Sequence, residues 1–139
     1  QQQQQQDPEM GAGSHVDYGA LTLIAEDCAG LEVQRRGSLD NPWEDVPHVE
    51  GAFVVNTGYV LEKLTNGRLP ATRHRVQNKN AMDRYSLALF LDPNPESIVK
   101  PLEALMKEGE KPKYEQCVAG HKGVRFGNPK YLELAAARA

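Results

Sequence analysis

Three side chains in this chain could together hold one metal ion: His15, Asp17 and the distant His74. Residues two positions apart on an extended strand project to the same face, so His15 and Asp17 are predicted to point toward one ion. The long interval before His74 leaves room for several short strands that bring the chain back to the site. Two imidazoles and one carboxylate on one face of an octahedron are typical of a mononuclear iron(II) centre with open positions.

A second pair of residues could bind a carboxylate. Arg84 and Ser86 have the same i, i+2 spacing and would present a guanidinium group and a hydroxyl group on one strand face. The alternative interpretation is a strand-surface ion pair beside a solvated hydroxyl. A His-x-Asp pair alone is a weak signal, so the prediction of a metal site depends on its combination with His74 and Arg84-x-Ser86.

The rest of the chain predicts many short strands separated by turn residues. Tyr59 to Thr65 is predicted as a short helix, and the following Asn66-Gly67 suits a left-handed helix end. Asn56, at the end of an apolar run, is interpreted as a turn residue. This pattern favours an all-β sandwich or barrel with minor α content. The predicted strands cover residues 21–24, 31–33, 45–49, 51–56 (a buried strand), 69–76 and 85–91.

Composition changes along the chain predict its organisation. Residues 1–10 contain a run of six glutamines that cannot bury apolar surface, so they are predicted to form a disordered tail. Residues 11–102 are predicted to form the core. Residues 103–139 are predicted as a C-terminal extension, because short helical patterns occur over Leu102–Lys107 and Tyr131–Ala137.

Charge and hydropathy exclude several kinds of partner. A net charge of −3 provides no electrostatic footprint for nucleic acid, so no nucleic-acid partner is predicted. The arginines on either side of His74 would alternate away from it, which predicts a solvated face. No apolar run approaches the ~18 residues that span a membrane, and no signal-peptide pattern is present, which predicts a cytoplasmic location. Cys28 and Cys117 lack metal-binding spacing and are predicted to be reduced thiols.

The segments that carry these motifs resemble a known family. HVDYGALTLIAED, GAFVVNTGYVLEKLTNGRLPATRHRV and DRYSLALFLDPNP together resemble the iron(II)- and 2-oxoglutarate-dependent dioxygenases of the isopenicillin N synthase-like type, over roughly residues 11–102. The resemblance implies a double-stranded β-helix, or jelly-roll, core. It also implies a core that is incomplete at its N-terminus, because family members carry a helical region and a further strand upstream of the His-x-Asp motif.

The resemblance implies specific roles for the motif residues. Iron(II) would be held by His15, Asp17 and His74, and the distal carboxylate of the cosubstrate 2-oxoglutarate by Arg84 and Ser86. The implied reaction uses O2 to oxidise a small organic substrate, most often by hydroxylation, and releases succinate and CO2. Two alternatives stay open. One is an iron oxidase of the same family that does not use 2-oxoglutarate and retains the Arg-x-Ser pair; the other is a truncated, non-catalytic jelly-roll remnant or binding module. The identity of the substrate and the oligomeric state do not follow from the sequence.

Overall fold

The computed structural model of this protein describes residues 9–36, 42–79 and 82–120. These residues divide into two compact units. The first contains residues 9–16, 23–36, 42–55, 72–79 and 82–89, and the second contains residues 17–22, 56–71 and 90–120. Among the residues described, no helix is long and apolar enough to cross a membrane.

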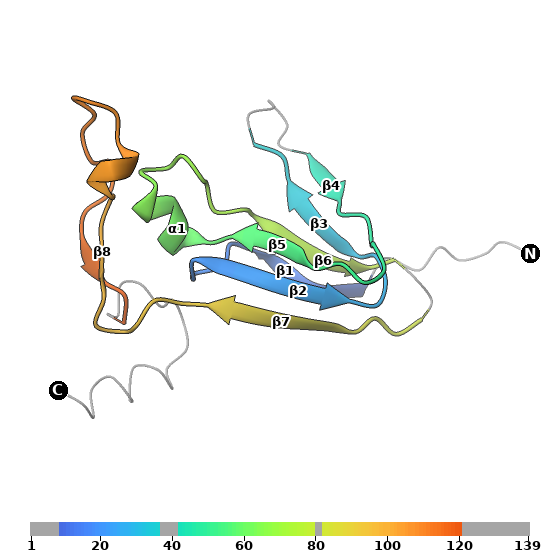
Figure 1. The fold of residues 1–139 in the computed structure, drawn as a ribbon. Helices are drawn as coiled ribbons and strands as arrows, with labels where there is room; N and C mark the ends of the chain where they lie inside the picture. Colours follow the sequence, from blue (N-terminus) through green and yellow to red (C-terminus); the bar gives the residue numbers. More distant parts are fainter. Residues whose placement is uncertain (1–8, 37–41, 80–81, 121–139) are drawn as a thin grey trace, which may run out of the picture. The chain divides into compact units, whose positions relative to one another are not determined.

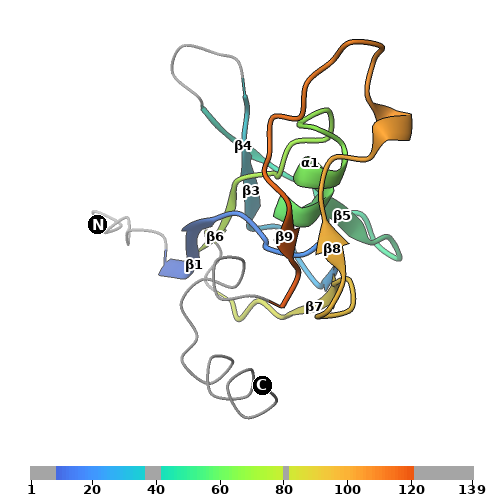
Figure 2. The same ribbon diagram turned by 90° about the vertical axis from the view of Figure 1, so that its left-hand side faces the viewer.

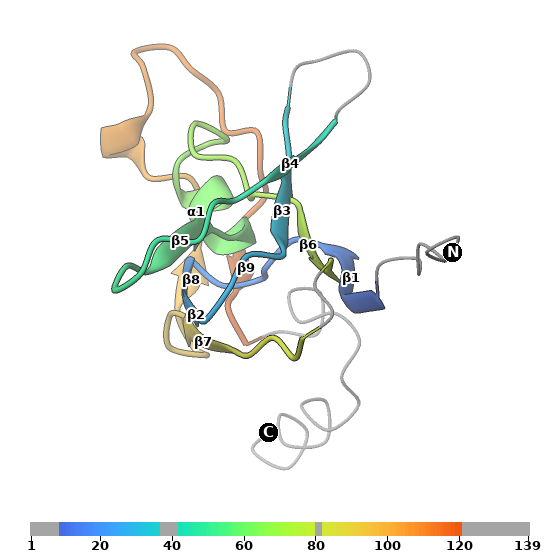
Figure 3. The same cartoon turned by 90° about the vertical axis from the view of Figure 1, so that its right-hand side faces the viewer.

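The first unit is built on a four-stranded antiparallel sheet in the order β1-β6-β3-β4 (Figure 1). Figure 3 shows β3 between β6 and β4. His74, the first residue of β6, lies opposite His15 of β1 on one side and Val33 of β3 on the other. The sheet therefore places His15 and His74, which are far apart in sequence, side by side on neighbouring strands. The bounds of its strands are Glu9–His15 (β1), His74–Asn78 (β6), Leu31–Gln34 (β3) and Trp43–Asp45 (β4).

Strand β1 contains two more residues than the part of β6 with which it pairs. Met10 lies opposite Gln77, Ala12 opposite Val76, and His15 opposite His74, with irregular register in the two intervals between them. Each interval contains one extra residue on β1, as in a β-bulge, and bulges bend a strand and redirect its side chains. Ala12 and His15 therefore lie opposite two β6 residues that share a face, although three positions separate them in sequence.

A three-stranded sheet has the order β5-β2-β7, and each of its strands contributes residues to both units. Strand β2 (Leu21–Glu26) buries Thr22 and Ile24, which is the alternation expected when one face of a strand is covered. Strand β5 comprises Val54–Thr57. Every residue of β7 (Ser86–Leu91) is exposed.

The second unit contains the helix and a short hairpin. Helix α1 (Tyr59–Leu64) begins without a side-chain cap, and the backbone carbonyl of Asp17 accepts a hydrogen bond of 2.9 Å from the N–H of Tyr59. This contact satisfies one of the free N–H groups at the helix start and ties down the backbone at Asp17. Strands β8 (Ile98–Val99) and β9 (Cys117–Val118) lie side by side (Figure 2), and a 3₁₀ turn covers Glu103–Leu105. The core contains Val60, Val99 and Ala119, with Tyr18, Ala20, Leu64 and Cys117 packed against it.

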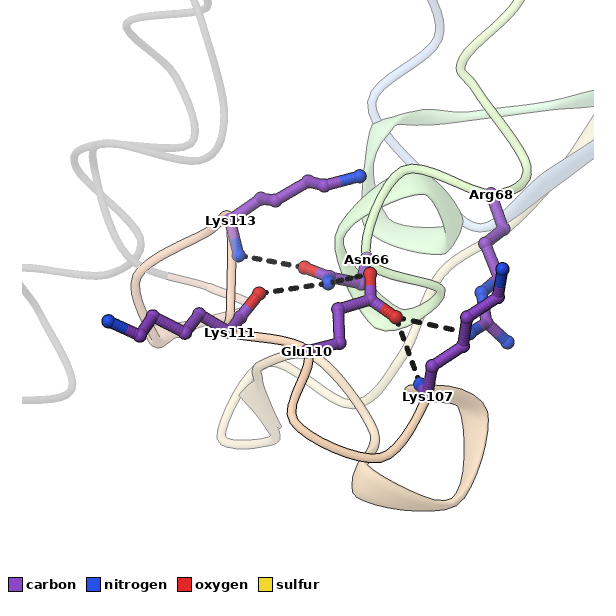
Figure 4. Close-up of polar contacts among 6 residues, drawn as sticks. All are labelled: Asn66, Arg68, Lys107, Glu110, Lys111 and Lys113. Atoms are coloured by element: carbon purple, nitrogen blue, oxygen red, sulfur yellow. Dashed lines mark hydrogen bonds and ion pairs between the residues drawn. The ribbon is translucent and has the colours of Figure 1, made fainter.

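The end of α1 anchors the segment that follows the 3₁₀ turn (Figure 4). Asn66 has φ = 52° and is fully buried. Its side chain donates to Glu110 Oε1 at 2.7 Å and to the Lys111 carbonyl at 3.2 Å, and accepts from the Lys113 N–H at 2.8 Å. The backbone N–H of Lys107 and the amide of Asn66 hold the pKa of Glu110 below its ordinary value. One asparagine thus both ends the helix and fixes residues 110–113.

The structure confirms the all-β class with minor α content and the helix beginning at Tyr59, with left-handed Asn66 and Gly67 after it. The strand predicted over 69–76 begins only at His74. Its first residues bond instead to the helix region, with the Leu69 N–H donating to Thr65 Oγ1 and the Ala71 N–H to Glu62 Oε2. The strand predicted over 45–49 lies instead at Trp43–Asp45, so prediction and structure share only Asp45.

Several other predictions differ in detail. The buried strand predicted over 51–56 is partly exposed, since Phe53 is 65% and Val55 58% exposed. Strand β1 includes residues 9 and 10, which were expected in the tail, while residues 1–8 lie outside the described residues. The helical pattern over 102–107 gives only the 3₁₀ turn, and that over 131–137 lies outside the described residues. Among the described residues, neither Cys28 nor Cys117 is in a disulfide.

Candidate metal centre and carboxylate-binding cavity

His15 and His74 form a cross-strand pair in the first unit. They lie directly opposite each other in the β1–β6 register, and their ring centroids are 4.3 Å apart. His74 is 5% exposed, whereas His15 is exposed. The antiparallel pairing of strands far apart in sequence is therefore what brings the two imidazoles together.

Both imidazoles are held in the same tautomer. Nδ1 of His15 lies 2.7 Å from the Gly13 carbonyl oxygen, and Nδ1 of His74 lies 3.0 Å from the Thr72 carbonyl oxygen. A carbonyl oxygen can only accept, so Nδ1 carries the proton in each ring. In a neutral imidazole the lone pair is then on Nε2, which is the arrangement that metal-binding histidines require.

Asp17 belongs to the second unit and is held by two donors. It is 6% exposed, and its Oδ2 accepts hydrogen bonds from Thr22 Oγ1 at 2.5 Å and from Asn56 Nδ2 at 2.8 Å. These bonds fix the orientation of the carboxylate. Asn56 is therefore a buried partner of Asp17 in strand β5, and its interpretation as a turn residue was wrong. The family resemblance put Asn56 near the site, but no local pattern shows its bond to Asp17, because the two residues are 39 positions apart.

The strand expected to carry both His15 and Asp17 is shorter than predicted, since β1 ends at His15. Asp17 nevertheless stays near His15, because two peptide units limit the separation of their Cα atoms to about 7 Å. His15, Asp17 and His74 each offer one ligand atom, an imidazole nitrogen or a carboxylate oxygen. Two nitrogen donors and one oxygen donor suit iron(II) and leave coordination positions for other ligands.

Arg84 and Ser86 lie together in the first unit, although β7 begins only at Ser86. Arg84 Nη1 donates to Ser86 Oγ at 3.3 Å, and Arg84 Nη2 forms an ion pair of 2.5 Å with Glu26 Oε2. The Arg84 side chain is 6% exposed and that of Glu26 is 3% exposed. The Arg84–Glu26 ion pair is therefore buried rather than at the strand surface, whereas Ser86 is exposed. Glu26 had no assigned role in the sequence, because its partner lies 58 positions away.

Arg84 and Ser86 line a cavity of about 540 Å³ in the first unit. Small residues of β1, Gly11 and Ala12, leave room for it opposite Val76. A cavity of this size suits a small organic acid. Its remaining lining residues are Asn78, Asp83 and Tyr85.

The basic residues after His74 are paired within the first sheet. Arg75 Nε contacts Glu32 Oε2 at 2.5 Å, and its guanidinium carbon lies 4.3 Å from the centre of the Trp43 ring. Lys79 Nζ contacts Glu32 at 2.7 Å and Asp45 at 2.6 Å. Burial raises the pKa of Glu32, but Lys79 and Arg75 outweigh it and hold that pKa below its ordinary value. Arg73 and Lys79 are exposed, as predicted for a solvated face, whereas the Arg75 side chain is only 23% exposed because it contacts Glu32 and Trp43.

The sequence and the fold agree with one known family. The family model of the 2OG-Fe(II) oxygenase superfamily matches residues 1–93, which is more than half of the chain. The chain belongs to this superfamily, whose members are iron(II)- and 2-oxoglutarate-dependent enzymes with a jelly-roll core, as the motif residues predicted.

Curated relatives of this chain include an oxidoreductase and a hydroxylase. A 2-oxoglutarate-Fe(II) type oxidoreductase from Aspergillus fumigatus is 41% identical over 105 residues, covering 73% of this chain and 30% of the relative. A bi-functional coumaroyl CoA and feruloyl CoA ortho-hydroxylase from Ipomoea batatas is 39% identical over 107 residues, covering 76% of this chain and 29% of the relative. The chain thus spans less than a third of the length of these relatives.

A solved structure shows the same fold with the cosubstrate bound. A full-length protein from Neurospora crassa, in complex with alpha-KG and thymine, is similar with a TM-score of 0.71 and 31% sequence identity. The similarity covers 93% of this chain and 38% of that chain. It supports iron(II) and 2-oxoglutarate as the cofactor and cosubstrate of this family.

Proposed function

We propose that this chain carries the metal-binding and cosubstrate-binding part of an oxygenase that uses O2 and 2-oxoglutarate to oxidise a small organic molecule, most often by hydroxylation. The observation that carries the proposal is the cross-strand pair of His15 and His74, with both rings in the tautomer that presents Nε2. The location of the protein in the cytoplasm stays a prediction.

In this proposal His15, Asp17 and His74 hold iron(II). The Gly13 and Thr72 carbonyl groups keep the two imidazoles oriented, and Thr22 and Asn56 keep the Asp17 carboxylate oriented. Such partners of metal ligands fix ring direction and raise ligand basicity. When bound, iron(II) and 2-oxoglutarate supply the oxidising chemistry, in which decarboxylation of the keto acid to succinate and CO2 accompanies oxidation of the substrate.

Arg84 and Ser86 bind the distal carboxylate of 2-oxoglutarate in this proposal. A guanidinium group and a hydroxyl group side by side can donate several hydrogen bonds to one carboxylate. Burial of the Arg84 side chain strengthens these bonds, because water competes less for the donors. The cavity between β1 and residues 83–86 is the space that the acid would occupy.

Visible spectroscopy under anaerobic conditions tests the proposal directly. The purified chain is mixed with iron(II) and then with 2-oxoglutarate, and His74→Ala serves as the control. We expect a metal-to-ligand charge-transfer band that depends on both additions and is absent in the control. A folded chain that binds iron(II) but gives no band would overturn the assignment of 2-oxoglutarate. A chain that binds no iron(II) would overturn the assignment of the metal ligands.

Turnover is measured separately, as succinate formed and O2 consumed. Coumaroyl CoA, feruloyl CoA and thymine are reasonable first compounds to test, since one relative is an ortho-hydroxylase of the two CoA derivatives and one similar structure is a complex with thymine. Succinate formation that requires O2 and intact His74 would support oxygenase activity in this chain. Charge transfer without succinate would limit the chain to binding.

A further inference from the structure

We propose that Glu26 is a positioning residue for the carboxylate site. Its carboxylate pairs with one edge of the Arg84 guanidinium, and the edge beside Ser86 is then oriented to bind the carboxylate of 2-oxoglutarate. The inference rests on the proposed function, because it concerns the same Arg84. It assigns a role to a residue of β2 that no motif pointed to.

Arg84 is held on three sides. Nη2 is paired with Glu26 Oε2 at 2.5 Å, Nε donates to the Cys28 carbonyl at 3.3 Å, and Nη1 donates to Ser86 Oγ at 3.3 Å. An arginine side chain has much rotamer freedom, and restricting it before the ligand arrives removes that cost from binding. Of these three contacts, only Ser86 both has a hydroxyl group that can donate to a carboxylate and lines the cavity of about 540 Å³.

The charge of Glu26 explains how the Arg84 side chain can be buried. A buried guanidinium without a counter-charge is costly, and the carboxylate of Glu26 supplies that counter-charge. The arginine therefore need not swing toward solvent when no acid is bound. Removal of Glu26 would release Arg84 to reorient, and the acid would then have to order it.

A small cavity holds the other oxygen of Glu26. Among the described residues, Glu26 Oε1 and His48 Nδ1 are both buried without a hydrogen-bond partner, and both residues line a cavity of about 70 Å³. That volume has room for roughly one or two water molecules, and a polar cavity with two such atoms is one that water occupies. A water bridging Glu26 and His48 would keep the carboxylate fixed from its far side.

Titration calorimetry of the iron(II)-loaded chain with 2-oxoglutarate, under anaerobic conditions, tests the role of Glu26. We expect Glu26→Ala to raise the Kd for 2-oxoglutarate by about tenfold or more, since hydrogen bonds to charged groups are the stronger ones. Glu26→Gln keeps an acceptor for Arg84 and should stay within roughly threefold of the wild type. The Kd for iron(II) should not change in either variant.

Two controls separate positioning from a general loss of structure. Glu32→Ala removes the carboxylate of a second, less buried Glu–Arg pair in the same unit and should leave the 2-oxoglutarate Kd unchanged. Glu26→Ala combined with Arg84→Ala should bind no worse than Arg84→Ala alone, because Glu26 acts only through Arg84. Additive losses in the double variant would overturn the inference.

A measurement on the wild-type chain covers the case in which Glu26→Ala does not fold. Nitrogen-15 spectroscopy should show the Arg84 Nε–H protected from exchange before 2-oxoglutarate is added. Rapid exchange that slows only on addition of the acid would overturn the inference. If the wild type binds no 2-oxoglutarate, the proposed function falls and this inference with it. Equal binding by the wild type and Glu26→Ala would overturn the inference alone.

Discussion

His15 and His74 face each other across the β1–β6 ladder with ring centroids 4.3 Å apart. The two histidines lie 59 positions apart in sequence. So do their neighbours Ser14 and Arg73, whose side chains are also in contact. Backbone pairing and the two carbonyl acceptors hold both rings side by side.

His74→Ala should greatly weaken iron(II) binding, because it removes one of the two nitrogen donors. We expect the Kd for iron(II) to rise by at least about 100-fold, which exceeds the usual effect of losing a partner of a metal ligand. Anaerobic titration calorimetry measures it. His48→Ala is the matched control, since His48 lies in the loop before β5 and should leave the metal affinity unchanged.

Loss of a donor to Asp17 should weaken the metal site without removing a ligand. Asn56→Leu and Thr22→Val each delete one hydrogen bond to Asp17 Oδ2, and each should raise the Kd for iron(II) by about 10- to 100-fold. The same titration measures both variants. Unchanged metal affinity in both would show that Asp17 is not a ligand or needs no support.

Gly58→Ala should be strongly destabilising. A Cβ at Gly58 would lie 2.2 Å from the Gly19 carbonyl oxygen and 3.0 Å from that of Asp17, so the backbone segments would have to separate. We expect a loss of about 3 kcal/mol in the free energy of unfolding, at the upper end for overpacking. Urea denaturation measures it. Gly13→Ala is the control, because a Cβ at Gly13 meets no atom within 4 Å and should change the free energy little.

Asn66 combines a left-handed backbone with a buried hydrogen-bond network, and two substitutions separate these effects. Asn66→Gly loses the side-chain bonds to residues 110–113 but tolerates φ = 52°. Asn66→Ala loses the same bonds and adds strain of about 1 kcal/mol. We expect Asn66→Ala to be the less stable by that amount in urea denaturation. Equal stabilities would mean that the backbone relaxes.

Acid should weaken the first sheet through Glu32. The pKa of Glu32 is below its ordinary value of 4.5 because Lys79 and Arg75 outweigh the effect of burial. The unfolded chain therefore binds this proton more readily than the folded chain. The resulting stabilisation is complete above about pH 4.5 and is lost as the pH falls through the folded pKa. Unfolding free energies across this range should fall less steeply in Glu32→Gln than in the wild type.

The candidate motif residues were chosen from the sequence by residue type and order. The structure brings His15, Asp17 and His74 together, and it places Arg84 beside Ser86. Their binding roles stay predictions. The local geometry was less predictable. Both pairs were placed on strands by alternation, but β1 ends at His15 and β7 begins at Ser86, because strand ends are set by pairing partners elsewhere in the chain.

The partners that hold these side chains could not be predicted. Asn56 and Glu26 lie 39 and 58 positions from the residues that they support. No periodicity or motif connects such residues, since their proximity is a property of the sheet order. Helix α1 was predicted well for the opposite reason: its signals, a helical pattern followed by Asn66-Gly67, all lie within one short segment.

The extra residues of β1 have a consequence for comparing this chain with its relatives. Between Met10 and His15, β1 contains two residues that have no partner in β6. The number of residues in this interval can therefore change without moving His15 away from His74. Deletion of one residue in this interval would turn an irregular stretch into a regular one and keep His15 opposite His74. We therefore expect length differences among relatives to be tolerated just before the His-x-Asp motif. By the same count, one residue inserted between His74 and Val76 would match the extra residue of β1 between Ala12 and His15 and keep the two histidines opposite each other.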